Sequence, residues 1–100
     1  MKSGMAIHSF AGRALRRFFL EGKIPRGAGW AGVAKVAVRN LDMLEYANDL
    51  NDLASAPGNR LEALKGDLAG LHSIRINDQW RLVFRWTPLG PADVDIKDYH

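Results

Sequence analysis

Residues 72–86 of the chain read His72-Ser73-Ile74-Arg75-Ile76-Asn77-Asp78-Gln79-Trp80-Arg81-Leu82-Val83-Phe84-Arg85-Trp86. Apolar side chains recur at every second position on both sides of the central Asn77-Asp78 pair, which is the spacing of strands with one buried face. Asn and Asp both tolerate positive φ, so this pair predicts a tight turn between two antiparallel strands. A third alternating run over residues 93–97 follows the turn at residues 89–91, and it completes a predicted antiparallel meander.

Upstream of this sheet the apolar spacing becomes helical. Leu15, Phe18 and Phe19 lie at i, i+3 and i+4, so they predict an amphipathic helix over residues 12–21. A longer apolar stripe predicts a second helix over residues 31–47. Each helix has one apolar face, which is typical of helices that pack on a sheet.

Two shorter signals complete the predicted fold. Apolar and polar residues alternate over residues 6–10, which predicts a short N-terminal strand, and Asn48-Asp49 predicts the cap of a further short helix. We therefore expect a compact α+β fold. Its N-terminal strand and two main helices pack on one face of a small antiparallel β-sheet.

Strand parity predicts where the arginines of the sheet point. Side chains alternate between the two faces, so if Leu82 and Phe84 face the helices, Arg81 and Arg85 point to the opposite, open face. Arg75 joins them from the neighbouring strand. A basic, uncovered sheet face of this kind is suited to holding a phosphodiester, with Arg75 and Arg85 on the flanking phosphates.

The composition is that of one globular domain. The 100 residues are 47% hydrophobic and 25% charged, enough for a modest core. We expect a single domain over residues 6–100, preceded by a disordered extension over residues 1–5. The absence of cysteine excludes disulfides and fits a reducing, cytoplasmic location, and no apolar run approaches the roughly 20 residues that span a bilayer. No residue spacing predicts a metal site or a phosphate-binding loop, so we expect no cofactor.

Basic residues concentrate in the first part of the chain. Residues 1–39 hold eight Lys or Arg residues against one acidic residue, whereas residues 40–70 hold six acidic residues against two basic ones. A basic region attracts polyanions, above all RNA or DNA. Arg13, Arg16 and Arg17 share the polar face of the first helix, where they either bind RNA or lie in solvent.

The chain ends on Asp98-Tyr99-His100, directly after the third predicted strand of the meander. Termini usually fray, but a strand would hold these three side chains in place. The unperturbed pKa of a histidine side chain is about 6.5, which suits general acid–base catalysis near neutral pH. We expect His100 to act as the acid and Tyr99 or Asp98 to assist on the base side, and the reverse assignment stays open.

Several segments of the chain share a pattern with one protein family. They are Leu61-Glu62-Ala63-Leu64-Lys65-Gly66-Asp67, residues 72–81, Phe84-Arg85-Trp86 and the terminal Asp98-Tyr99-His100, with Ile7, Ser9-Phe10, Leu15, Phe18-Phe19 and Gly22 at the start. With these residues the chain resembles the HigB toxins of the RelE-like toxin–antitoxin superfamily. The resemblance covers nearly everything from residue 7 onward. One position departs from it, because HigB toxins often have a histidine where this chain has Glu62.

The resemblance implies a RelE-like fold and the toxin of a type II toxin–antitoxin system. It implies a ribosome-dependent endoribonuclease that cleaves mRNA in the decoding site by metal-free acid–base chemistry and inhibits translation. The implied partners are the ribosome, mRNA and a HigA-type helix-turn-helix antitoxin in a hetero-oligomer. The catalytic positions of the family fall on Lys65, Arg81, Asp98, Tyr99 and His100.

A second hypothesis stays open beside the enzyme. A non-catalytic module of the same fold would bind RNA, the ribosome or an antitoxin without cutting RNA. Lys65 and Arg81 suit the stabilisation of negative charge on a phosphorane, and Arg81 can hold phosphate bidentately. Their presence together with the intact tail favours the enzyme.

Overall fold

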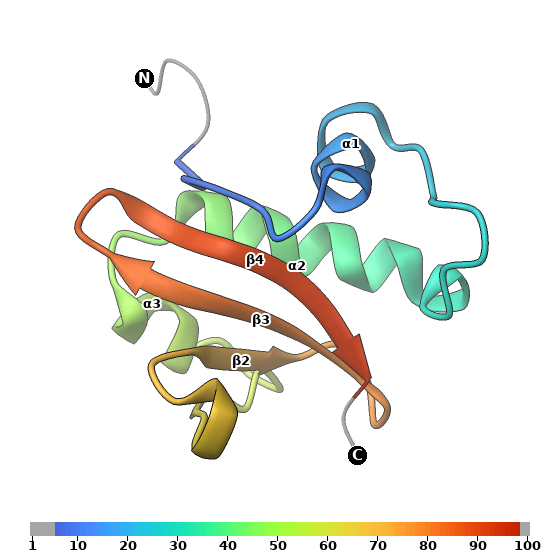
Figure 1. Cartoon of the computed structure of the whole chain (residues 1–100). Helices are drawn as coiled ribbons and strands as arrows, with labels where there is room; N and C mark the ends of the chain where they lie inside the picture. Colours follow the sequence, from blue (N-terminus) through green and yellow to red (C-terminus); the bar gives the residue numbers. More distant parts are fainter. Residues whose placement is uncertain (1–5, 99–100) are drawn as a thin grey trace.

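The computed structural model describes residues 6–98, which form a helical layer followed by an antiparallel sheet (Figure 1). The helices are α1 (Arg13–Glu21), α2 (Ala34–Tyr46) and α3 (Leu50–Ala54), with the one-turn 3₁₀ helices η1 (Ala31–Val33) and η2 (Gly66–Leu68). The strands are β1 (Glu62–Ala63), β2 (His72–Arg75), β3 (Trp80–Thr87) and β4 (Gly90–Asp98). They lie in this order across one sheet, and all neighbours are antiparallel. The predicted α+β architecture is therefore confirmed.

The strands β2, β3 and β4 carry the alternating apolar pattern. Ile74 pairs with Leu82 across the first two of these strands, and Leu82 pairs with Ile96 across the next two. Side chains of directly paired residues lie on the same face, and this row packs in the core with Leu41 and Leu44 of α2. The row therefore defines the helix-facing side of the sheet, and the residues next to it in sequence face the other way.

Two helix boundaries agree with the sequence patterns. Gly22 ends α1 in the left-handed conformation, with φ of 75°, where a glycine carries no Cβ penalty. The Asp49 carboxylate accepts a hydrogen bond from the Asp52 backbone N–H at 3.1 Å, so it caps α3 as predicted. No helix within residues 6–98 is long and apolar enough to cross a membrane.

The predicted turn at Asn77-Asp78 is present, but its backbone differs from the expected one. Among residues 6–98 the only non-glycine residues with positive φ are Arg60 and Asp93. The turn is held instead by the Asn77 side chain, whose Oδ1 accepts a hydrogen bond from the Trp80 backbone N–H at 2.7 Å. An Asx turn of this kind needs no left-handed residue.

The prediction of an N-terminal strand over residues 6–10 is wrong. Of these residues only Phe10 forms a β-bridge, parallel to β4. The backbone N–H groups of Ala6 and Ile7 donate instead to the carboxylate of Glu45 in α2, at 2.8–2.9 Å. A β-ladder needs such donors for its own pairing, so residues 6 and 7 do not pair with β4. The residues that follow make a few backbone hydrogen bonds to Pro91 and Val94 of β4, but they form a single bridge and no strand.

The strand β1 has no counterpart in the sequence patterns, because two residues are too few to show alternation. Its residues Glu62 and Ala63 pair with Ser73 and His72 of β2. This pairing brings the segment between α3 and η2 onto the part of the sheet where the predicted arginines lie.

Candidate active site

A pocket of about 170 Å³ lies between the sheet and the segment that follows β1. Its lining consists of Leu64, Leu68, Ser73, Arg81, Val83, Lys97 and Asp98. Ser73 pairs with Val83 and alternates with the helix-facing Ile74, so the pocket lies on the face of the sheet away from the helices. Two of the predicted catalytic residues, Arg81 and Asp98, contribute to it.

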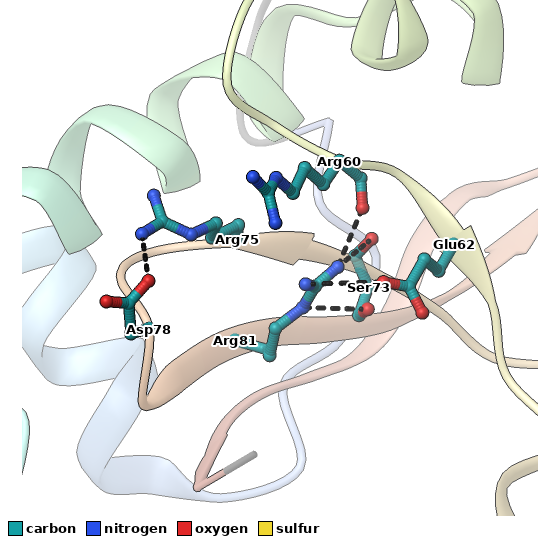
Figure 2. Close-up of polar contacts among 6 residues, drawn as sticks. All are labelled: Arg60, Glu62, Ser73, Arg75, Asp78 and Arg81. Carbon is teal, nitrogen blue, oxygen red and sulfur yellow. Dashed lines mark hydrogen bonds and ion pairs between the residues drawn. The ribbon is translucent and has the colours of Figure 1, made fainter.

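Arg81 is held in a fixed position by its neighbours (Figure 2). Its Nε donates to Ser73 Oγ at 3.1 Å, and its Nη2 donates to the carbonyl oxygens of Arg60 at 2.7 Å and Ser73 at 3.4 Å. Arg81 is only 5% exposed. Arg81 lies on the predicted face of the sheet, away from the helices. The prediction that this face is open at Arg81 is wrong, because the Arg60 carbonyl group and the Glu62 carboxylate lie against its guanidinium group.

Glu62 of β1 forms an ion pair with this arginine (Figure 2). Its Oε1 lies 3.5 Å from Nη1 of Arg81, and the side chain of Glu62 is 45% exposed where that of Arg81 is 6% exposed. The carboxylate can therefore move into solvent while the guanidinium stays in place. A phosphate that binds Nη1 must compete with Glu62.

A row of cations crosses the sheet at this point. Arg75 of β2 pairs with Arg81 of β3, and Arg81 pairs with Lys97 of β4. Directly paired residues share one face, and like charges in such positions destabilise a sheet. The row therefore destabilises the sheet, but its concentrated positive charge favours the binding of an anion.

Acidic residues partly offset the outer cations of the row. Lys97 Nζ lies 3.7 Å from Asp95 Oδ2, and the guanidinium of Arg75 binds the carboxylate of Asp78. The hydrogen bond and the charge of Arg75 lower the pKa of Asp78 below its ordinary value. The side chain of Asp78 is 98% exposed and that of Asp95 is 38% exposed, so these ion pairs are weak and can exchange with other anions.

Asp98 stands at the rim of the pocket, where the chain leaves β4. It pairs with Trp80, and its carboxylate accepts a hydrogen bond from Gln79 Nε2 at 3.1 Å. Tyr99 and His100, the other predicted catalytic residues of the tail, lie outside the described residues.

Lys65, the remaining predicted catalytic residue, is not part of the pocket lining. It is exposed and directly precedes η2, between the pocket residues Leu64 and Leu68. The structure therefore places it on the segment that forms a wall of the pocket.

The predicted RNA-binding arginines separate into two groups. Arg75 adjoins the pocket, and Arg85 lies further along β3, where it forms an ion pair with Asp93 at 3.3 Å. The others are exposed on α1 and do not line the pocket: Arg13, Arg16 and Arg17. The α1 arginines are therefore a separate basic surface.

Three contributors to the site were not predicted from the sequence. Lys97 and Ser73 could have been found by strand parity, because both share the face of Arg81. The third contributor is the carbonyl group of Arg60, and no sequence signal indicates it. The Arg60 backbone has φ of 47°, a conformation that non-glycine residues seldom adopt and that often occurs at functional sites.

The described part of the site offers fixed positive charge and hydrogen-bond donors in a partly closed pocket. This arrangement can bind a phosphate and stabilise negative charge that develops on it. Among residues 6–98, no histidine lines the pocket. Within residues 6–98, no group of three or more His, Asp or Glu side chains is placed to hold a metal ion.

Comparison with known proteins gives relatives at the level of sequence. A family model described as the RelE-like toxin of the type II toxin–antitoxin system HigB matches residues 8–100. Toxin HigB-1 of Vibrio cholerae serotype O1 is 43% identical over 56 residues, which are 56% of this chain and 59% of that protein. The match therefore spans less than two thirds of that relative. An uncharacterized protein of Haemophilus influenzae is 38% identical over 76 residues, covering 72% of this chain and 70% of that protein.

A solved structure shares the fold. A chain of the YoeB–YefM complex from Staphylococcus aureus aligns with a TM-score of 0.58 at 22% identity, and the alignment covers 94% of this chain and 97% of that chain. The family model extends over almost the whole sequence, including the sheet that carries the pocket. The chain therefore belongs to the HigB family of RelE-like toxins of type II toxin–antitoxin systems.

Proposed function

We propose that this protein is a ribosome-dependent endoribonuclease that cleaves mRNA in the decoding site and so inhibits translation. The observation that best supports the proposal is the buried, hydrogen-bonded guanidinium of Arg81 between the cations Arg75 and Lys97. The pocket also reaches Asp98, from which the chain continues into Tyr99-His100. A phosphodiester in this pocket would meet positive charge from the sheet and proton-transfer groups from the tail.

The proposed reaction uses the ribose 2′-hydroxyl as the nucleophile on the adjacent phosphorus. A base takes the proton of the 2′-hydroxyl while the new O–P bond forms a phosphorane. The bond to the 5′-oxygen then breaks as an acid donates a proton to that oxygen. The products are a 2′,3′-cyclic phosphate and a 5′-hydroxyl, so the step balances with acid–base groups alone.

Each residue of the proposed site has a role in this reaction. His100 acts as the acid, and Tyr99 or Asp98 assists on the base side. Lys65 and Arg81 stabilise the negative charge of the phosphorane. Arg75 and Arg85 hold flanking phosphates, and the arginines of α1 bind RNA further from the cleaved bond.

We propose a HigA-type helix-turn-helix protein as the antitoxin. Membership of the family implies a cognate antitoxin, which would form a hetero-oligomer with this protein and inhibit it. A reading frame for a helix-turn-helix protein next to the gene of this toxin would support the assignment. Co-purification of the two products would then test the complex directly.

Replacement of Tyr99 by Ala tests the catalytic role of the tail. We expect the rate of mRNA cleavage on translating ribosomes to fall by about 10²–10⁴-fold, which is the usual contribution of general acid–base groups. The thermal unfolding midpoint should stay unchanged, because the replacement leaves the core of residues 6–98 intact. The measurement is single-turnover cleavage of a defined mRNA, with Tyr46→Ala as a matched control on the exposed end of α2.

The same experiment separates the enzyme from a binding module. If the wild-type protein binds ribosomes but leaves the mRNA intact, the proposal is wrong and the non-catalytic module is correct. If Tyr99→Ala cleaves as fast as the wild type, the catalytic assignment of the tail is wrong.

The ion pair between Glu62 and Arg81 predicts a mild toxin. Since a half-exposed ion pair contributes at most about 1 kcal/mol, Glu62→Gln should raise kcat/KM for cleavage by up to about fivefold. Growth inhibition on expression should increase in parallel. Asp42→Asn removes one negative charge from an exposed position of α2 and is the control. A decrease in kcat/KM for Glu62→Gln would show instead that the carboxylate assists catalysis.

A further inference from the structure

A groove lies at the edge of β2, beside the candidate active site. α2, the loop from α3 to β1 and the end of β2 form it, and its lining includes Arg39, Asn40, Met43, Pro57, Asn59 and Arg75. Its volume is about 330 Å³. We call it the β2-edge groove. It exists because β1 pairs only with His72 and Ser73, which leaves the edge of β2 beyond them to the loop.

Two buried amide side chains fix the walls of this groove. Asn40 is 2% exposed, and its Nδ2 donates to the carbonyl oxygen of Arg75 at 2.9 Å. Asn59 is 4% exposed, and its Nδ2 donates to the carbonyl oxygen of Leu53 at 3.0 Å. The backbone carbonyl oxygen of Asn59 accepts a hydrogen bond from the backbone N–H of Arg75 at 2.6 Å. α2, the loop and β2 are thus joined by hydrogen bonds, so the groove keeps its shape without a ligand.

Positive charge dominates the groove. Arg39 and Arg75 line it, and Arg60 directly follows Asn59 in the loop. Within residues 6–98, neither the guanidinium of Arg39 nor that of Arg60 takes part in an ion pair. Arg75 pairs with Asp78, whose side chain is 98% exposed and whose pKa is lowered by Arg75 and more weakly by Arg60. Within residues 6–98, Arg75 is thus the only one of these three arginines that forms an ion pair, and its partner is exposed.

Two arginines at the groove, Arg60 and Arg75, lie next to Arg81 of the candidate active site (Figure 2). Arg75 lies directly opposite Arg81 in the register of β2 and β3. The carbonyl oxygen of Arg60 accepts the hydrogen bond from Arg81 Nη2 at 2.7 Å. Arg60, whose backbone holds the central arginine of the pocket, thus also directly follows a residue that lines the groove.

The opposite side of the pocket has a different charge. There the cations Arg85 and Lys97 form ion pairs with Asp93 at 3.3 Å and with Asp95 at 3.7 Å. Each cation on this side has its own acid, so the charges cancel. Toward α2, by contrast, Arg39 and Arg60 have no acidic partner within residues 6–98, so unbalanced positive charge extends from the pocket in that direction.

Building on the endoribonuclease proposed above, we propose that the β2-edge groove binds phosphates of single-stranded RNA on one side of the cleaved bond. Arg39 and Arg75 contact these phosphates, and Arg60 adds positive charge at the boundary with the pocket. Guanidinium groups bind phosphate oxygens bidentately, and binding at Arg75 displaces the exposed Asp78 carboxylate. The RNA strand then crosses the pocket and continues toward α2, where it gains affinity from each added phosphate.

Binding of RNA oligonucleotides to the full-length protein tests this inference without cleavage. The probes are fluorescent single-stranded RNA oligonucleotides with a 2′-O-methyl group at each ribose. Each probe extends the same short strand by one to three nucleotides on its 5′ or its 3′ side. Anisotropy titrations at several salt concentrations give Kd and its salt dependence. The variants are Arg39→Gln and the double variant Arg39→Gln/Arg60→Gln, and both sites are exposed. Arg26→Gln, in the exposed loop after α1, removes the same charge away from the groove.

We expect the wild-type protein to bind more tightly as the probe grows on one side and to gain little from growth on the other. Arg39→Gln should lose most of this gain, and the slope of log Kd against log salt should fall by about 0.7 for one lost phosphate contact. The double variant should lose more, whereas Arg26→Gln should keep the gain. Equal gains on both sides, or identical effects of Arg39→Gln and Arg26→Gln, would overturn the inference. Failure of the wild type to cut mRNA would leave this binding result intact, so the two proposals can fail separately.

Discussion

Replacement of Arg81 by Ala is expected to abolish mRNA cleavage and the growth inhibition that follows from it. The guanidinium lies at the centre of the cation row and is oriented by Ser73 and Arg60. Removal of one preoriented donor to a developing oxyanion typically lowers kcat by about 10²–10³-fold. The measurement is single-turnover cleavage on ribosomes, together with growth after induced expression.

The same replacement also affects stability, so a second variant is needed. Without the guanidinium, the buried oxygens of Ser73 lose their hydrogen bonds, which typically costs about 1–3 kcal/mol. Arg81→Lys keeps the positive charge, yet its ammonium cannot reproduce the planar fork of the guanidinium. We expect Arg81→Lys to stay folded by circular dichroism and to cleave at least about 10-fold more slowly than the wild type. Wild-type cleavage by a folded Arg81→Lys protein would show that the bidentate group is not needed.

The largest expected effect on stability comes from Gly90→Ala at the start of β4. Gly90 has φ of 118°, and a Cβ built there would clash with the carbonyl oxygen of Ala6. That carbonyl cannot retreat easily, because the N–H groups of residues 6 and 7 are bound to Glu45. Backbone strain and overpacking each cost about 1–3 kcal/mol. We therefore expect the free energy of unfolding to fall by about 2–5 kcal/mol.

For a domain of this size, such a loss lowers Tm by roughly 10 °C or more. Differential scanning calorimetry measures the change, and Gly32→Ala is the matched control. A Cβ at Gly32 meets no atom within 4 Å, so this variant should melt close to the wild type. If Gly90→Ala and Gly32→Ala had the same Tm, the N-terminal segment would not lie as close to β4 as the structure places it.

The parts of the fold with strong periodicity were predictable, and the parts governed by single contacts were not. The alternation from residue 72 to residue 97 contains the three long strands, because each buries one face. The N-terminal segment has the same alternation, yet the carboxylate of Glu45 accepts the backbone N–H groups of residues 6 and 7, and only Phe10 forms a bridge to β4. Glu45 is 38 residues away from Ile7 in the sequence, so a local pattern of apolar and polar residues cannot reveal that it accepts these hydrogen bonds.

The candidate site was also predictable from the sequence only in part. Parity places Arg75, Arg81 and Lys97 on one face, and the register confirms that they pair. Parity does not say what covers that face, and the burial of Arg81 depends on the loop before β1 and on the left-handed Arg60. The side chain of Glu62 meets Arg81 only because β1 pairs with β2.

The hydrogen bonds that hold Arg81 also determine when its conformational freedom is lost. A free arginine side chain has rotamer entropy equivalent to about 2 kcal/mol. Here Ser73 and the Arg60 carbonyl restrict the rotamers of Arg81 as the sheet forms. The rotamer entropy of Arg81 is therefore lost when the protein folds, and it is not lost a second time when RNA binds. Because Arg81 is already ordered, more of the free energy of its interaction with the phosphate is available to stabilise the transition state.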